Sequence, residues 1–224
     1  MTEAFNMDCM EAMAQMKDNE YDLAIVDPPY GIDIANQTMG LGGGFTKHKK
    51  TKDYKTGGDW DKSPPPPEYF TELFRVSSNQ IIWGGNYFDL SPTPCYLFWD
   101  KKNGGSDFAD GELAWTSFKS PIRRFSFLWA GCMRDKNNYG KEVRIHPTHK
   151  PIDLYRWTLK NYAKEGDRIL DTHLGSGSSR IAAHDMGFDF VGYEIDKDYF
   201  DAQEKRFANH IQQQSLFTPK DMYT

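Results

Sequence analysis

Short apolar runs alternate with amphipathic segments along most of this chain. Such runs occupy residues 22–26, 80–83, 95–99, 168–170 and 190–193, and their length and composition are typical of buried strands. The spacing of apolar positions predicts helices over residues 9–16, 68–76, 151–162, 178–186 and 196–209. Strand-then-helix order at both ends of the chain predicts an α/β fold with a mostly parallel, doubly wound, Rossmann-like sheet.

Two stretches depart from this pattern. Residues 31–62 are rich in glycine and lysine, and we expect a long loop there. Residues 101–144 alternate polar turns with two short predicted strands, 112–118 and 125–128. A length of 224 residues suits a single α/β domain with room for an insertion.

Composition restricts the class of protein. No apolar run approaches the roughly 18 residues of a membrane-spanning helix, and the N-terminus lacks a secretory pattern. The cysteines at positions 9, 95 and 132 are scattered and odd in number, which is typical of free thiols in a reducing cytoplasm. We therefore expect a cytoplasmic protein.

Basic residues gather in two segments although the net charge is −5. Charge runs are common on solvated loops, but two basic segments on an acidic body also suit a nucleic-acid cleft. The residues that we expect to contact phosphate are Lys47, Lys49, Lys50, Lys52, Lys119, Arg123, Arg124 and Arg134.

A glycine-rich turn lies between a predicted strand and a predicted helix near the C-terminus. It reads Asp171-Thr172-His173-Leu174-Gly175-Ser176-Gly177, and Glu194 ends the next strand. Glycines let the backbone approach a nucleotide, and a carboxylate at the end of the second strand can accept both ribose hydroxyls. An ordinary glycine-rich turn is the alternative.

The choice of nucleotide follows from what the turn lacks. Position 180 holds arginine where a dinucleotide fingerprint has its third glycine, and no Walker lysine is present. An adenosyl ligand without phosphates fits better, which favours S-adenosylmethionine as the cofactor and disfavours a nicotinamide dehydrogenase. Asp171 would then hold the ammonium group of its methionine end.

The second motif is Asp27-Pro28-Pro29-Tyr30, directly after an apolar run. An exocyclic amino nitrogen is a poor nucleophile, because its lone pair is delocalised into the base. Strong acceptors for its hydrogens improve it, and the Asp27 carboxylate and the rigid Pro28 carbonyl supply two acceptors. Tyr30 offers a ring for a base taken out of the stack. A strand-ending turn with a capping aspartate is the alternative.

Together these motifs resemble the amino-methyltransferases of DNA. The acceptor motif precedes the cofactor turn, an order that is similar to the β class of that family, in which a target-recognition region lies between them. Residues 6–9, 83–87, 99–101 and 146–151 resemble further segments of the family. The resemblance implies a methyltransferase sheet with a small target-recognition insertion.

The resemblance also implies roles for single residues. Asp27, Pro28, Pro29 and Tyr30 would form the catalytic corner that serves the target base. The turn departs from the family pattern at His173, where an aromatic ring usually follows proline, so the role of His173 is open. The residues that would line the cofactor site are Asp8, Cys9, Asp27, Lys150, Asp171, His173, Leu174, Gly175, Ser176, Gly177 and Glu194.

The expected domain organisation follows the motif order. We expect one methyltransferase domain over residues 1–224, with an acceptor half at 1–100 and a target-recognition insertion at about 101–145. A cofactor-binding half at 146–210 and a flexible tail at 211–224 complete it.

The predicted reaction is methylation of adenine N6 in DNA, because the family's cytosine-N4 enzymes usually carry serine where this chain has Asp27. Cytosine-N4 methylation of DNA and adenine methylation of RNA remain open. Methylation of a protein glutamine is disfavoured, since those enzymes typically carry asparagine at that position. Intact motifs argue against a non-catalytic binding subunit.

Partners are less constrained. DNA is the expected partner, a homodimer is suggested by family analogy, and pairing with a restriction nuclease is open. Gln213-Gln214-Ser215-Leu216-Phe217 resembles the peptide by which bacterial proteins dock on the replication sliding clamp, although an apolar tail packed on the body is the favoured interpretation. His146 and His149 have no third ligand at suitable spacing, so we expect no metal.

Overall fold

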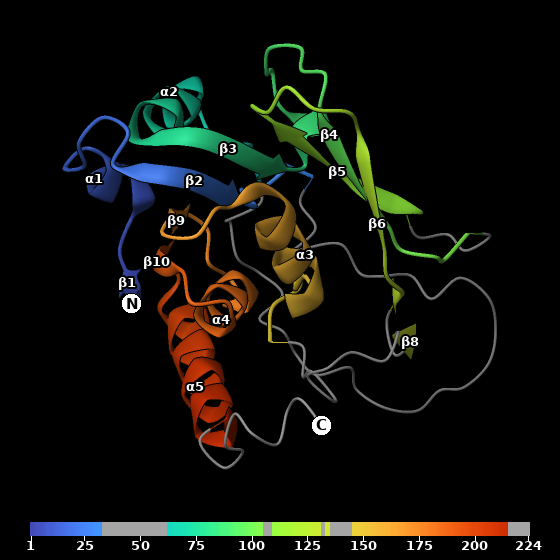
Figure 1. Ribbon diagram of the computed structural model, residues 1–224. Helices are drawn as coiled ribbons and strands as arrows, with labels where there is room; N and C mark the ends of the chain where they lie inside the picture. The colour runs from blue at the N-terminus through green and yellow to red at the C-terminus, as the bar shows by residue number, and fades with distance from the viewer. Residues whose placement is uncertain (33–61, 105–108, 131–132, 135–144, 215–224) are drawn as a thin grey trace.

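The computed structural model describes residues 1–32, 62–104, 109–130, 133–134 and 145–214. Its centre is an eight-stranded sheet in the order β1-β10-β9-β2-β3-β5-β4-β6 (Figure 1). A separate two-stranded sheet pairs β7 with β8. The mostly parallel α/β fold expected from the sequence is confirmed.

The strands fall where apolar runs were expected, with small shifts at their ends. Their bounds are β1 (Thr2–Asn6), β2 (Tyr21–Val26), β3 (Ser77–Trp83), β4 (Tyr96–Asp100), β5 (Gly111–Thr116), β6 (Arg123–Ser126), β7 (Trp129–Ala130), β8 (Met133–Arg134), β9 (Arg168–Asp171) and β10 (Asp189–Glu194). The helices are α1 (Cys9–Met13), α2 (Pro67–Val76), α3 (Ile152–Tyr162), α4 (Ser178–Asp185) and α5 (Lys197–Gln214), with a short 3-10 turn, η2 (Gly85–Tyr87).

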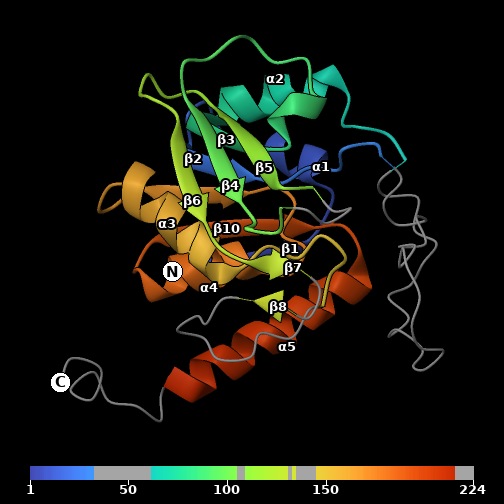
Figure 2. The ribbon, with the colours of Figure 1, turned by 90° about the vertical axis from the view of Figure 1, so that its right-hand side faces the viewer.

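Helices cover both faces of the sheet, α1 and α2 on one side and α3, α4 and α5 on the other (Figure 2). Successive residues of a strand point to opposite faces of the sheet and therefore pack into the two cores alternately. In β2, Leu23 and Ile25 belong to the core under α3 and α4, whereas Ala24 and Val26 belong to the core under α1 and α2. Burial on both faces explains why β2 is a continuous apolar run.

The structure differs from the sequence expectations in two helix bounds, in one additional strand and in the pairing of two strands. Helix α1 ends at Met13, not near residue 16, and α5 continues to Gln214, so residues 211–214 are helical and not part of a tail. Strand β1 was not expected; it pairs with β10 at the sheet edge. Strands β5 and β6 fall within the expected insertion, yet β5 lies between β3 and β4, and β6 pairs with β4.

The strand order places a functional crevice. From the adjacent parallel pair β9 and β2, the sheet continues through β10 and β1 in one direction and through β3 in the other. Ligands of open α/β sheets bind outside the carboxyl ends of the strands at such a reversal. Both sequence motifs follow these strands, Asp27 after β2 and the glycine turn after β9.

Candidate active site

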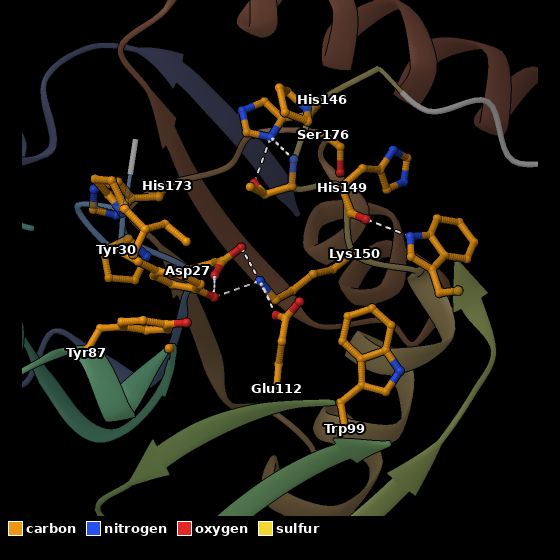
Figure 3. A pocket seen from close by; sticks show the side chains of 18 of the residues that line it. Asp27, Tyr30, Tyr87, Trp99, Glu112, His146, His149, Lys150, His173 and Ser176 are labelled. Atoms are coloured by element: carbon orange, nitrogen blue, oxygen red, sulfur yellow. Dashed lines mark hydrogen bonds and ion pairs between the residues drawn. The ribbon is translucent and has the colours of Figure 1, made fainter. Parts of the chain in front are cut away.

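One cavity of about 900 Å³ opens at the carboxyl ends of the parallel strands. Asp27, Pro28 and Tyr30 line one part of it, and Gly175 with Glu194 lines another. Two motifs that lie far apart in the sequence therefore meet in a single space (Figure 3). Among the residues expected in the site, those lining the cavity are Asp27, Pro28, Pro29, Tyr30, Lys150, His173, Leu174, Gly175, Ser176 and Glu194.

The acceptor corner is held by aromatic packing. The Tyr30 hydroxyl donates a 2.6 Å hydrogen bond to Asp27 Oδ1. The Tyr30 ring stacks on Tyr87, with 4.8 Å between ring centroids and 11° between planes. Gly84 has a φ of +72°, and a Cβ there would lie 2.1 Å from Tyr30 Cε1. Glycine is required here to bring the backbone against the tyrosine ring.

Lys150 lies between two carboxylates. Its ammonium forms an ion pair with Asp27, lies 3.1 Å from Glu112 Oε2 and donates to the Tyr30 hydroxyl at 3.1 Å (Figure 3). Only 3% of the Lys150 side chain is exposed. Burial lowers the pKa of Lys150, but Asp27 and Glu112 overcome that effect and raise it, so the ammonium stays charged.

The pKa of Asp27 responds to opposing influences. Burial raises this pKa, the Lys150 ammonium lowers it, and the nearby Glu112 carboxylate raises it, with a net upward shift. A carboxylate held in this way is a strong hydrogen-bond acceptor, because it is poorly solvated.

The glycine turn is shaped around Glu194. Gly175 (φ +51°) donates from its backbone N–H to Glu194 Oε2 at 2.8 Å, and the Asp196 N–H donates to Oε1 at 2.9 Å. Gly177, with a φ of +72°, is the N-cap residue of α4. These two hydrogen bonds hold the Glu194 carboxylate in the cavity lining at the end of β10. Burial raises the pKa of Glu194.

Asp171 lies behind the turn and does not line the cavity. Its side chain is buried and accepts hydrogen bonds from Ser179 Oγ at 2.5 Å and from the His173 N–H at 3.0 Å. Burial raises the pKa of Asp171 to about 7. The contacts assign it to shaping the turn, whereas the sequence suggested contact with the methionine ammonium.

His173 packs as a neutral aromatic ring. It meets Tyr69 edge to face at 5.2 Å, and its Nδ1 lies 2.9 Å from Thr172 Oγ1. Burial lowers its pKa to about 4. The imidazole thus supplies a flat, uncharged surface where the family resemblance implies an aromatic ring.

Two further expected cofactor residues lie beside the cavity, not in its lining. Asp8 caps α1 by accepting from the Met10 N–H at 2.7 Å. Cys9 follows it in the first turn, and burial raises the pKa of its thiol to about 12, so it is not a reactive thiolate.

Among the described residues, the expected phosphate contacts are not part of the cavity lining. Lys119, Arg123 and Arg124 are exposed on or just before β6, the outer strand of the sheet. Arg134 is in β8. The expected contacts Lys47, Lys49, Lys50 and Lys52, like Ser215, Leu216 and Phe217 of the clamp-like peptide, lie outside the described residues.

Three cavity residues that matter for the geometry of the corner had no predicted role. Tyr87 and Lys101 lie in segments that resemble the family, whereas Glu112 was not singled out. Lys101 and Glu112 form an ion pair of 2.5 Å. The one available signal was an acidic residue, Glu112, beginning an otherwise apolar predicted strand.

His146 and His149, which precede α3, also line the cavity. Their rings lie against local hydroxyl groups: His146 Nδ1 is 3.0 Å from Thr148 Oγ1, and His149 Nε2 is 3.3 Å from Ser178 Oγ. Within the described ranges, no group of three metal-ligating side chains occurs.

Comparison with solved structures defines the class of fold. The complex of M1.HpyAVI with SAM has a TM-score of 0.56 and 18% identity, covering 92% of this chain and 98% of that one. TTHA0409, a DNA modification methylase from Thermus thermophilus, gives 0.53 and 15%, covering 94% and 96%. The cytosine-N4-specific PvuII DNA methyltransferase gives 0.54 and 10%, covering 94% and 91%.

Sequence comparison defines the family. The N6/N4 DNA methylase family model matches residues 82–205, more than half of the chain, and the chain belongs to this family. Relatives include the Type II methyltransferase M2.LlaDCHI of Lactococcus lactis subsp. cremoris, 27% identical over 66% of this chain and 48% of the relative. M.HinfI of Haemophilus influenzae is 25% identical over 89% of this chain and 66% of the relative. The chain thus spans about half to two thirds of these relatives' lengths.

One further observation concerns membranes. Among the residues that the structure describes, no helix is long and apolar enough to cross a bilayer.

Proposed function

We propose that this protein transfers a methyl group from S-adenosylmethionine to the N6 amino group of adenine in DNA. The observation that carries the proposal is the shared cavity, in which the acceptor corner at Asp27 and the glycine turn at Gly175 face a common space. Family membership supports a DNA amino group as the acceptor. The Type II names of its relatives support a role in modifying the sites of a restriction system.

The residues of the turn fit an adenosyl cofactor. Two positive-φ glycines let the backbone come close to a ligand, and a Cβ at Gly175 would point toward His146 at 3.7 Å. The Glu194 carboxylate lines the cavity, where it can accept hydrogen bonds from the ribose hydroxyls. When bound, S-adenosylmethionine supplies an electrophilic methyl group on a sulfonium. Solved neighbours of the same fold include complexes with it.

The acceptor residues act on the target amino group. The Asp27 carboxylate and the Pro28 carbonyl accept hydrogen bonds from the two N–H groups of the target, which localises the nitrogen lone pair toward the methyl donor. Asp27 is also the base that receives a proton from the methylated nitrogen, because burial makes its carboxylate more basic. Catalysis rests on positioning and polarisation, so no covalent enzyme intermediate is needed.

The choice of adenine rests on Asp27. Its position in the acceptor motif favours adenine by family resemblance, whereas the PvuII neighbour methylates cytosine N4. The deciding experiment incubates the protein with labelled S-adenosylmethionine and duplex DNA, single-stranded DNA or RNA, followed by nucleoside mass spectrometry. We expect N6-methyladenine in duplex DNA. N4-methylcytosine, or label in RNA alone, would replace this proposal.

The role of Asp27 has its own test. Asp27→Asn keeps the shape of the side chain but replaces one carboxylate oxygen by a donor, so we expect methyl transfer to fall by at least about a hundredfold. Cofactor affinity, measured by calorimetry, should change by less than about threefold, because the turn at Gly175 is untouched. Glu165→Gln, at an exposed position, is the matched control. Near-normal turnover in Asp27→Asn would refute the assignment.

A further inference from the structure

Glu112 faces the reacting corner from an unexpected direction. It lies in β5, an antiparallel strand between β3 and β4, whereas Asp27 follows β2 and Lys150 precedes α3. Its carboxylate nevertheless lies 3.1 Å from Lys150 Nζ, on the side opposite Asp27 (Figure 3). Lys150 is thus shared by two carboxylates from separate elements.

Four charged side chains form a connected cluster in which positive and negative groups alternate. Lys101 forms an ion pair of 2.5 Å with Glu112, so the chain runs Asp27, Lys150, Glu112, Lys101 with alternating sign. Burial alone raises the pKa of Glu112, but Lys150 and Lys101 together overcome it and lower that pKa to about 2. Glu112 is therefore a permanent negative charge beside Lys150 at neutral pH.

Without Glu112, Lys150 would have Asp27 as its one carboxylate partner among the described residues. A lysine ammonium that donates only to Asp27 and Tyr30 would compete with the target amino group for the same oxygens. Both oxygens of Asp27 already accept a hydrogen bond, one from Tyr30 and one from Lys150. We infer that Glu112 is a positioning residue that holds Lys150 in a bridging position, so that the ammonium does not occupy the remaining acceptor capacity of the Asp27 carboxylate and this capacity stays open to the target amino group. This inference rests on the proposed function.

Glu112 and Lys150 shift the pKa of Asp27 in opposite directions, which distinguishes an electrostatic effect of a substitution from a loss of folding. Glu112 raises the pKa of Asp27 and Lys150 lowers it. Neutralising Glu112 should therefore lower the pKa of Asp27, and neutralising Lys150 should raise it. The other groups that act on Asp27 or on this cluster stay in place in both variants; they are Tyr30, Tyr69, Lys101, Tyr155 and Asp171.

The first experiment measures the pKa of Asp27 directly and does not depend on methyl transfer. Carbon-13 NMR of aspartate carboxyls, with the Asp27 signal identified by its loss in Asp27→Asn, follows the Asp27 titration in the intact protein. We expect the midpoint to fall by about one pH unit in Glu112→Gln and to rise by about one unit in Lys150→Met. Glu112→Asp retains the charge and should leave the midpoint near that of the wild type.

The second experiment reads the consequence for the reaction. In single-turnover assays with DNA, we expect Glu112→Gln to slow methyl transfer by roughly ten- to a hundredfold, the range set by one charge-assisted hydrogen bond. The acid limb of its rate profile should move to lower pH, in the same direction as the NMR midpoint. Glu165→Gln, an exposed glutamate given the same substitution, should match the wild type in both experiments.

The outcomes separate two failures. Wild-type protein that transfers no methyl group to any nucleic acid removes the proposed function, and the inference about Asp27 as acceptor goes with it. An active wild type whose Glu112→Gln variant shows normal rates and an unmoved Asp27 midpoint overturns the inference alone. Slow transfer with an unmoved midpoint in Glu112→Gln, or a Glu112→Asp variant as shifted as Glu112→Gln, assigns Glu112 to structure and also overturns it.

Discussion

His173 departs from the family pattern but still places an aromatic ring at this position. Its ring is neutral and packs edge to face on Tyr69, so aromatic surface is what the position supplies. We expect His173→Phe to keep cofactor affinity within about threefold of wild type, whereas His173→Ala should lose more, because truncation leaves a cavity. Calorimetric titration with S-adenosylmethionine measures both variants. Equal losses in the two would show that a polar atom of the imidazole is required.

Asp171 predicts a pH dependence of stability. Its folded pKa of about 7 lies above the usual aspartate value of 3.8, so the folded state binds more protons than the unfolded state between these values. Stability from this group is therefore complete below about pH 4 and lost as pH rises through 7. Relative to Asp171→Asn, the wild type should lose on the order of 4 kcal/mol of unfolding free energy between pH 4 and 8. Urea unfolding of the two proteins across that range tests this, and parallel curves would contradict it.

At the scale of elements, the Gly84 turn after β3 sets the position of Tyr30. A Cβ at Gly84 would collide with the tyrosine ring, whereas Gly187, with a similar φ of +77°, has no atom within 4 Å of its Cβ position. Alanine at either site carries backbone strain, but only Gly84→Ala adds the collision. We expect it to cost about 1–3 kcal/mol more unfolding free energy than Gly187→Ala and to slow methyl transfer. Similar thermal unfolding of the two variants would show that Tyr30 moves freely.

Elements were predictable from the sequence where one chain segment carries the whole signal. Strands β2 and β9 are continuous apolar runs because both their faces are buried, and the motifs after them are contiguous. Strand β1 was missed because its residues are only partly covered at the sheet edge. The place of β5 between β3 and β4 depends on pairing between distant segments, which no local pattern encodes.

The same reasoning separates the site residues that were found from those that were missed. Asp27 and Tyr30 belong to a short motif with its own chemistry, whereas Glu112 gains a role only because β5 enters the sheet beside Lys150. Tyr87 likewise matters through its stacking on Tyr30. Side chains brought together by tertiary pairing require the structure, since their spacing in sequence has no relation to their spacing in the cavity.

At the scale of the whole molecule, the proposed function requires DNA to reach a cavity in a protein of net charge −5. Arg123 and Arg124 are exposed on β6, which pairs with β4. We propose that they contact the phosphates of the bound DNA. Because phosphate contacts release counterions, we expect Arg123→Gln/Arg124→Gln to weaken DNA affinity and to reduce the slope of log affinity against log salt by roughly two. Fluorescence anisotropy with a labelled duplex at several salt concentrations measures the slope.

The control for this edge removes equal charge elsewhere. Lys160→Gln/Lys164→Gln neutralises two exposed lysines at the end of α3 remote from Lys150, so it changes net charge by the same amount. If overall charge alone governs binding, the two double variants will lose affinity equally, and β6 then has no special part in binding. If phosphates contact β6, only the arginine variant will change the salt slope, because counterion release counts contacts and not net charge. Methyl transfer by the arginine variant should then recover at low salt, since the reacting corner at Asp27 is unaltered.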